Sequence, residues 1–138
     1  MNQISEEQTI GHVIQHLGVC AMDEDLEEWK QFDRIYQQIL DRVAPMGTNS
    51  ELSHLYEWIR KVFEYNVTKG KRSRGLLVVK AYKVLAKGLN KEVTEEQLQT
   101  ARILGWSLEI LQAFALMMDD IMDESVTRRG QTCWHQKV

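Results

Sequence analysis

The 138-residue chain has only two cysteines, Cys20 and Cys133, and no Cys-x-x-Cys pair. Two cysteines support neither a disulfide framework nor a zinc site, so a reducing compartment is the simpler expectation. A single proline, Pro45, and eight glycines leave few breaks in the pattern. No repeat or low-complexity segment divides the chain, and we expect one domain or part of one.

The sequence also lacks a strong charge of either sign. Its formal net charge is -3, which gives no electrostatic reason to expect nucleic-acid binding. The start, MNQISEEQ, is polar and acidic, unlike a secretory signal or a transit peptide. No apolar run reaches the roughly 18 residues of a membrane span. We therefore expect a cytoplasmic protein with no membrane span.

The pattern that is present is helical along the whole chain. TEEQ at 94–97 is a capping box that starts the longest segment, and no breaker follows before about Asp123. Its apolar residues wrap most of the circumference, so we expect this helix, about 45 Å long, at the centre of an all-α antiparallel bundle. Leu52 and Leu55 are expected to face inward from an earlier helix. The expected helices span about residues 5–17, 26–43, 51–63, 76–87 and 94–123.

The stretch LQAFALMMDDIMDESVTRRG, residues 111–130, runs from an apolar segment straight into three aspartates. Asp119 and Asp123 are four residues apart and share one helix face, while Asp120 lies about 100° around the helix and can support them. A cation relieves their repulsion, and Mg²⁺ usually binds one or two carboxylates plus substrate phosphates. The alternative is a helix end that simply enters solvent.

Basic residues follow the aspartates at once. Arg128 and Arg129 precede Gly130, and guanidinium groups bind phosphate through paired hydrogen bonds. Acids that hold a metal beside arginines that hold phosphate indicate a metal–diphosphate site. The alternative is that the arginines only form ion pairs with Asp123 and Glu124.

A second basic segment, TKGKRSRG at residues 68–75, precedes an apolar helix. Positive charge in a glycine-containing loop at a helix N-terminus is typical of a phosphate-binding loop. The loop does not have the Walker A spacing, which argues against a nucleoside triphosphate. Taken alone, a basic loop of this kind is usually just a solvated turn. Its cations are Lys69, Lys71, Arg72 and Arg74.

Two histidines, His12 and His16, also have helical spacing. They could bind zinc, but no third ligand lies near them in the sequence. They lie opposite the apolar stripe of their segment. We therefore expect an exposed surface pair.

In order and spacing, GKRSRG, LQAFALMMDDIMD and TRRGQTCWHQ resemble the first conserved blocks of the farnesyl diphosphate synthase type of trans-prenyltransferase, in the polyprenyl synthetase family. The resemblance runs from about Leu26 to the last residue. It implies an all-α isoprenoid synthase fold and a reaction that joins dimethylallyl or geranyl diphosphate to isopentenyl diphosphate. It also implies Mg²⁺ as the cofactor and a homodimer in the full-length enzyme.

By motif position, the resemblance implies that Asp119 and Asp123 ligate Mg²⁺, with Asp120 supporting them. Arg128 would contact the allylic diphosphate. Gln112 is also notable without the resemblance, because it is a single amide in an apolar segment and a buried amide needs a hydrogen-bond partner. The residues implied to hold isopentenyl diphosphate are Lys71, Arg74, Gln112 and Arg129.

The chain departs from the family pattern in three places. Lys69 stands where the loop usually has a first glycine, and Ser73 where asparagine is common. Phe114 and Ala115 replace two adjacent phenylalanines of the animal enzymes. These two positions lie roughly 6–7 Å before Asp119 along the helix, where a growing prenyl chain would end. The product length is therefore left open.

Family chains are well over twice as long as this one, so we expect an N-terminal portion that is inactive alone. A second acidic motif would then follow Val138. The alternatives are a terpene synthase derived from the same family and a non-catalytic helical dimerisation module. The isopentenyl diphosphate set favours condensation, and the short chain favours the module. An incomplete bundle should expose an apolar patch that includes Trp106, Leu111, Phe114 and Met117.

Overall fold

The computed structural model describes residues 26–47 and 51–138. The chain divides into two units, Met1–Asp33 and Arg34–Val138, which are described separately. In the first unit, residues 26–33 are helical and Lys30 forms an ion pair with Glu27 at 3.4 Å. The helix expected at 5–17, with His12 and His16, lies outside the described residues.

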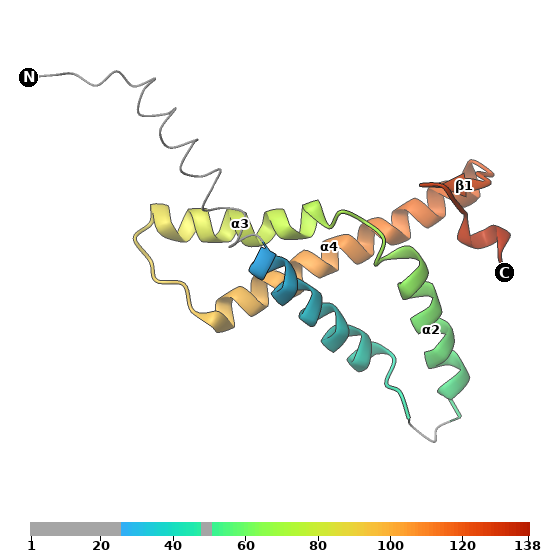
Figure 1. Cartoon of the computed structure of the whole chain (residues 1–138), viewed down its shortest axis with the longest axis horizontal. Coiled ribbons are helices and arrows are strands. Elements are labelled where there is room, and N and C mark those ends of the chain that lie inside the picture. Colours follow the sequence, from blue (N-terminus) through green and yellow to red (C-terminus); the bar gives the residue numbers. More distant parts are fainter. Residues whose placement is uncertain (1–25, 48–50) are drawn as a thin grey trace, which may run out of the picture. The chain divides into compact units, whose positions relative to one another are not determined.

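The second unit is all-α apart from one short hairpin, as the isoprenoid synthase class predicts (Figure 1). It begins with residues 34–43, which are helical up to the turn at Pro45. The Tyr36 ring packs against Trp106 with ring centroids 4.7 Å apart and a tilt of 38° between the ring planes. Arg60 donates a hydrogen bond to the main-chain oxygen of Ala44 at 2.7 Å, which ties the turn to the next helix.

Helix α2 spans Ser53–Asn66 and has no buried residue. The prediction that Leu52 and Leu55 face inward is wrong, because both are 49% exposed. Within the described residues α2 packs against the C-terminal segment, where Trp58 and Tyr65 both contact Trp134. Leu52 and Leu55 therefore stay exposed, whereas Ile59, Val62 and Phe63 of the same stripe are half-buried.

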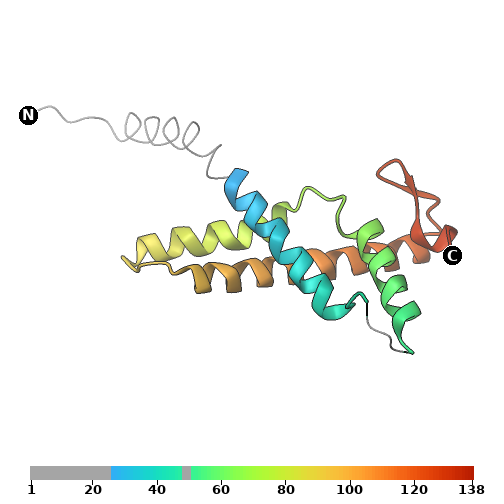
Figure 2. The same cartoon turned by 60° about the horizontal axis from the view of Figure 1, so that its bottom comes forward.

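Helices α3, Ser73–Gly88, and α4, Glu95–Met122, form an antiparallel pair that lies side by side in both views (Figures 1 and 2). The predicted capping box is confirmed. The Thr94 side chain accepts a hydrogen bond from the Gln97 main-chain N–H, and the Gln97 side chain accepts one from the Thr94 main-chain N–H. The side chains buried in these two helices are Val79, Ala86, Ala101, Arg102, Trp106, Ala113 and Asp120.

In the described residues the long helix α4 is buried along one side only, so the predicted central helix lacks part of its cover there. Leu111 and Phe114 are exposed, as expected of an incomplete bundle, but Trp106 is fully buried beside Tyr36. By length and composition α4 could also cross a membrane, a test that core helices of soluble proteins pass too. Exposed residues recur every three or four positions as one stripe: Leu104, Leu108, Leu111, Ala115, Met118 and Met122.

The C-terminal segment forms a hairpin that the sequence did not predict. Strands β1, Thr127–Arg128, and β2, Gln131–Thr132, are joined by Arg129 and Gly130, both with positive φ (53° and 75°). Two successive residues of this conformation are typical of a tight two-residue hairpin turn. The 3-10 helix η1, Trp134–Gln136, follows and contacts α2 and α4 (Figure 2). The hairpin thus holds both arginines near the end of α4.

Candidate functional site

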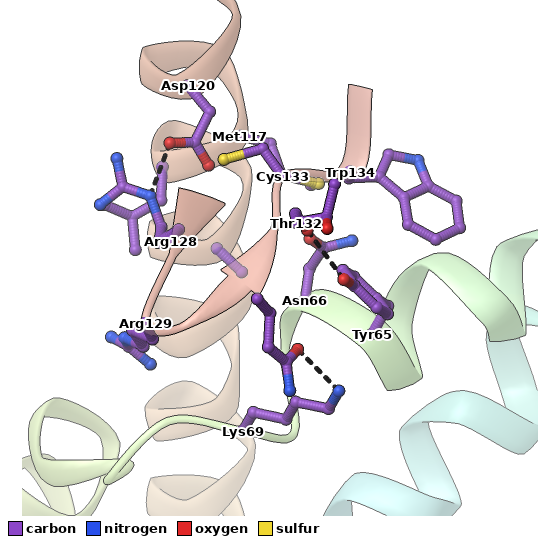
Figure 3. A pocket seen from close by; sticks show the side chains of 13 residues that line it. Tyr65, Asn66, Lys69, Met117, Asp120, Arg128, Arg129, Thr132, Cys133 and Trp134 are labelled. Carbon is purple, nitrogen blue, oxygen red and sulfur yellow. Dashed lines mark hydrogen bonds and ion pairs between the residues drawn. The ribbon is translucent and has the colours of Figure 1, made fainter. Parts of the chain in front are cut away.

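Arg128 and Asp120 form the most enclosed ion pair of the site (Figure 3). The Arg128 Nε donates to Asp120 Oδ1 at 2.7 Å, and Nη2 donates to Asp119 Oδ2 at 3.0 Å. Asp120 is only 5% exposed, and its hydrogen bond raises the pKa of Arg128. Arg128 therefore pairs with Asp119 and Asp120 instead of the expected alternatives, Asp123 and Glu124.

Cys133 lies on the other side of Asp120 and is buried. Its thiol donates a hydrogen bond to the Asp120 carboxylate, and burial, followed by that bond, raises the pKa of the thiol. Asp120 thus joins the hairpin residue Arg128 to Cys133, which precedes η1. This role of Cys133 could not be predicted from the sequence, because a lone cysteine in a polar stretch carries no signal of a partner.

Asp119 and Asp123 are the carboxylates that could hold a metal. They lie one helical turn apart, since the Asp123 N–H donates to the Asp119 carbonyl at 2.9 Å, and the Asp119 side chain is half exposed. No group of three potential metal-ligating side chains occurs in the described ranges. Two exposed carboxylates suit Mg²⁺, which takes its other ligands from water and substrate phosphates. Ligation by Asp119, Asp120 and Asp123 stays a prediction.

The structure brings together the four residues expected to hold isopentenyl diphosphate. They line one cavity of about 440 Å³, here named the loop cavity, between residues 66–74 and α4. Ser73 and Arg74, the first residues of α3, also line it, so the positive end of that helix dipole faces the cavity. Its polar and charged lining residues are Asn66, Lys69, Lys71, Arg72, Ser73, Arg74, Glu109, Gln112 and Arg129.

The loop cavity has an excess of uncompensated positive charge. Among the described residues its cations Lys69, Lys71, Arg74 and Arg129 form no ion pair. The buried Gln112 Oε1 has no hydrogen-bond partner there either, and a half-turn of the amide would place Nε2 at the same point. A buried polar atom without a partner is costly. The cavity is therefore suited to an anionic ligand that also meets the amide.

Glu109 is the carboxylate in the lining, but it already has a partner. Its Oε1 accepts the Gly75 N–H, in the first turn of α3, at 2.8 Å. The same carboxylate favours the charged form of Arg72, whose pKa is nonetheless lowered, mainly by burial. Arg72 lies over the Trp106 ring at 5.4 Å. Glu109 was not among the predicted site residues, although a lone acid in an apolar stretch is the same signal that identified Gln112.

Gly70 allows the basic loop and the hairpin to approach closely. A Cβ atom at this position would lie 3.2 Å from Arg129 Nη1, closer than ordinary contact. The Arg129 side chain therefore reaches over the loop backbone at Gly70. This approach places a hairpin arginine in the lining of the loop cavity.

A neighbouring cavity of about 370 Å³, here named the Arg128 cavity, lies against the hairpin (Figure 3). In Figure 3, Asp120 and Arg128 lie in the upper part of the cavity and Lys69 lies at the bottom. The Tyr65 hydroxyl donates to the Thr132 carbonyl at 2.8 Å, which fastens the hairpin to α2. Residues shared with the loop cavity are Asn66, Lys69, Ala113, Leu116 and Arg129.

An apolar groove of about 580 Å³ lies between α2 and α4. Ala113 lines this groove and both cavities, so the three spaces meet at that residue. Phe114 lines the groove, whereas Ala115 belongs to the exposed stripe of α4. The groove is lined by Val62, Phe63, Val67, Ser107, Ile110, Leu111, Ala113, Phe114 and Met117.

Comparisons with known proteins identify a family and several relatives. Residues 56–138 match the family model described as polyprenyl synthetase. The chain is 40% identical over 120 residues to the farnesyl pyrophosphate synthase of Mus musculus, covering 83% of this chain and 33% of the relative. For the farnesyl pyrophosphate synthase of Nezara viridula the identity is 46% over 110 residues, covering 80% and 26%.

A plant relative matches a shorter region more closely. Farnesyl pyrophosphate synthase 2 of Cannabis sativa is 51% identical over 78 residues, covering 56% of this chain and 22% of the relative. The chain therefore spans between about a fifth and a third of the length of these curated relatives.

Proposed function

The chain belongs to the polyprenyl synthetase family, and on this premise we propose that it forms the substrate-binding part of a prenyltransferase. The proposed reaction joins an allylic diphosphate to isopentenyl diphosphate. The relatives named farnesyl pyrophosphate synthase support a reaction of isoprenoid biosynthesis. Because the chain covers at most 33% of these relatives, turnover is proposed for the complete enzyme.

The observation that carries the proposal is the junction at Ala113. Two cavities lined by cations and one apolar groove all meet there. A ligand with an anionic head and a hydrocarbon tail fits such a junction, because its diphosphate meets arginines and lysines while its tail is removed from water. A prenyl diphosphate has this chemistry, whereas a purely polar anion would leave the groove unused.

We assign the allylic diphosphate to the Arg128 cavity. Arg128 is fixed there by Asp119 and Asp120, which take two of its five N–H donors and leave the others for phosphate oxygens. Asp119 and Asp123 would hold Mg²⁺ at the same helix end. When bound, magnesium would supply charge stabilisation for a departing diphosphate. Phe114 in the groove would limit the space for the prenyl tail.

We assign isopentenyl diphosphate to the loop cavity. Lys71 and Arg74 line this cavity but not the Arg128 cavity, and Arg129 lines both. Their charges would hold the diphosphate of the second substrate while its double bond faces the allylic carbon. The binding energy of a non-reacting diphosphate would thereby orient the carbon atoms that react. A terpene synthase, which only ionises its substrate, would not need this second set.

Calorimetry on the 138-residue chain tests the assignment, with geranyl diphosphate and isopentenyl diphosphate titrated separately in the presence of Mg²⁺. Lys71→Ala should lower the affinity for isopentenyl diphosphate by roughly tenfold or more. Arg128→Ala should lower the affinity for geranyl diphosphate as much, as expected for the loss of one charge-assisted contact. Lys87→Ala, at the far end of α3, is the control. Equal effects on both substrates would overturn the division, and no effect would overturn the site.

The metal assignment needs its own comparison. Asp119→Ala and Asp123→Ala should remove most of the Mg²⁺ dependence of geranyl diphosphate binding, because each removes an oxygen ligand. Glu124→Gln changes the charge by the same amount one residue beyond Asp123 and should keep that dependence. A Mg²⁺ dependence that survives the loss of either aspartate would exclude these carboxylates as ligands.

A further inference from the structure

Lys69 lies at the wall that the two cavities share. It follows α2 by three residues and lines both the loop cavity and the Arg128 cavity. Of the five shared lining residues, only Lys69 and Arg129 carry a charge. A cation at this wall can reach an anion on either side of it.

The contacts of Lys69 hold its side chain without neutralising it. Its Nζ donates to Gln131 Oε1 at 2.8 Å and lies 4.6 Å from the centroid of the Tyr65 ring. Both partners are uncharged, and Lys69 forms no ion pair within residues 26–47 and 51–138. An ammonium group has three donors, so two remain after the bond to Gln131.

The partners of Lys69 are themselves fixed in place. Tyr65 donates to the Thr132 carbonyl at 2.8 Å and packs on Trp134 with ring centroids 5.3 Å apart. The nitrogen of Lys137 also lies over the Tyr65 ring, at 4.4 Å. The dashed bonds in Figure 3 show that Lys69 and Tyr65 both reach the hairpin that carries Arg128 and Arg129. The ammonium group is therefore positioned before any ligand binds.

We propose that Lys69 is a further phosphate-binding residue, which contacts diphosphate oxygens from the wall between the two cavities and contributes to the binding of both substrates. This inference rests on the proposed function. Lys71 and Arg128 each line one cavity, so each should affect one substrate, whereas Lys69 lines both. Loss of the Lys69 charge should therefore weaken the binding of both ligands. This effect distinguishes Lys69 from Lys71 and Arg128.

The test is calorimetry on the 138-residue chain with Mg²⁺ and with geranyl diphosphate or isopentenyl diphosphate. Lys69→Met should lower the affinity for each ligand by about three- to tenfold, because an exposed ammonium group contributes less to binding than a buried one. Lys69→Arg keeps the charge and should stay within about twofold of the original chain. Lys137→Met is the matched control, since it removes an equal charge from the same tyrosine ring but lines neither cavity.

The outcomes separate this inference from the proposed function. If Lys69→Met binds both ligands normally while Lys71→Ala and Arg128→Ala behave as expected, Lys69 is not a ligand-binding residue and the proposed function stands. If Lys137→Met weakens binding as much as Lys69→Met, the effect comes from net charge or from the aromatic cluster, and the inference is wrong. If the original chain binds neither diphosphate, both proposals are overturned.

Discussion

Arg128 and Asp120 face each other across 2.7 Å, with the guanidinium Nε donating to a carboxylate that is almost completely buried. The pair connects the hairpin to the last turn of α4. Asp119 accepts a second bond from the same guanidinium while staying half exposed. The three aspartates therefore differ in their surroundings: Asp120 is committed to Arg128, whereas Asp119 and Asp123 remain accessible to a cation.

Asp120→Asn should destabilise the chain more than Asp123→Asn. The first change leaves Arg128 and Cys133 facing a neutral amide in a buried position, and it should lower the free energy of unfolding by about 1.5–3 kcal/mol. The second changes an exposed residue and should stay within about 0.5 kcal/mol. Urea unfolding followed by circular dichroism compares them. Equal losses would mean that the Arg128–Asp120 pair contributes nothing specific.

Glu109→Gln should weaken the start of α3. The carboxylate accepts the Gly75 N–H at 2.8 Å, and a neutral amide is a weaker acceptor for a helix N-terminus. We expect a loss of about 1 kcal/mol and faster hydrogen exchange in the first turn of α3. The control is Glu92→Gln, an exposed residue before α4. Unchanged exchange at Gly75 in Glu109→Gln would contradict this contact.

Tyr36→Phe should leave the chain as stable at neutral pH or stabilise it slightly. The buried Tyr36 hydroxyl has no hydrogen-bond partner in the described part of the chain, so its removal relieves a desolvation cost of about 1 kcal/mol. Thermal unfolding at pH 7 measures this effect. A large loss of stability would show that the hydroxyl has a partner.

The burial of Tyr36 should also make the free energy of unfolding depend on pH. Burial, followed by the charge of Glu64, raises the pKa of Tyr36 to about 12, whereas the unfolded chain titrates near 10. Above about pH 10 the unfolded state therefore binds fewer protons, and stability should fall as the pH rises toward 12. The Tyr36→Phe variant should not show this fall in stability at high pH, whereas the Tyr82→Phe variant should still show it. Parallel pH curves for all three chains would contradict the shift.

The exposed stripe of α4 should make the isolated chain self-associate. Leu104, Leu111 and Met118 lie on one face at helical spacing and are all exposed. Sedimentation velocity should show oligomers for the original chain and mainly monomer after all three are changed to lysine. Lysine at Gln99 and Thr100, exposed positions of the same helix, should not have this effect. A monodisperse original chain would favour an independent helical module.

The helices of the described residues, and the set of residues that gather at the loop cavity, could be predicted from the sequence. The Thr94 capping box and the end of α4 near Asp123 were predicted correctly. The four residues expected to bind isopentenyl diphosphate line one cavity, and their role stays a prediction. Each depends on interactions within one or two helical turns or on a recognisable motif. Such local information is present in consecutive residues, because a hydrogen bond between residues three or four apart needs no distant partner.

Which groups become partners depends on how the helices and the hairpin pack together. Gly75 and Glu109 are separated by 34 residues, and they meet because α3 packs antiparallel on α4. The two-residue strands were too short to give a periodic pattern, yet their hairpin selects Asp120 for Arg128 and Gln131 for Lys69. Choices between several nearby charges depend on burial and geometry. Both are properties of the packed chain, because they arise only when distant segments exclude water from the same place.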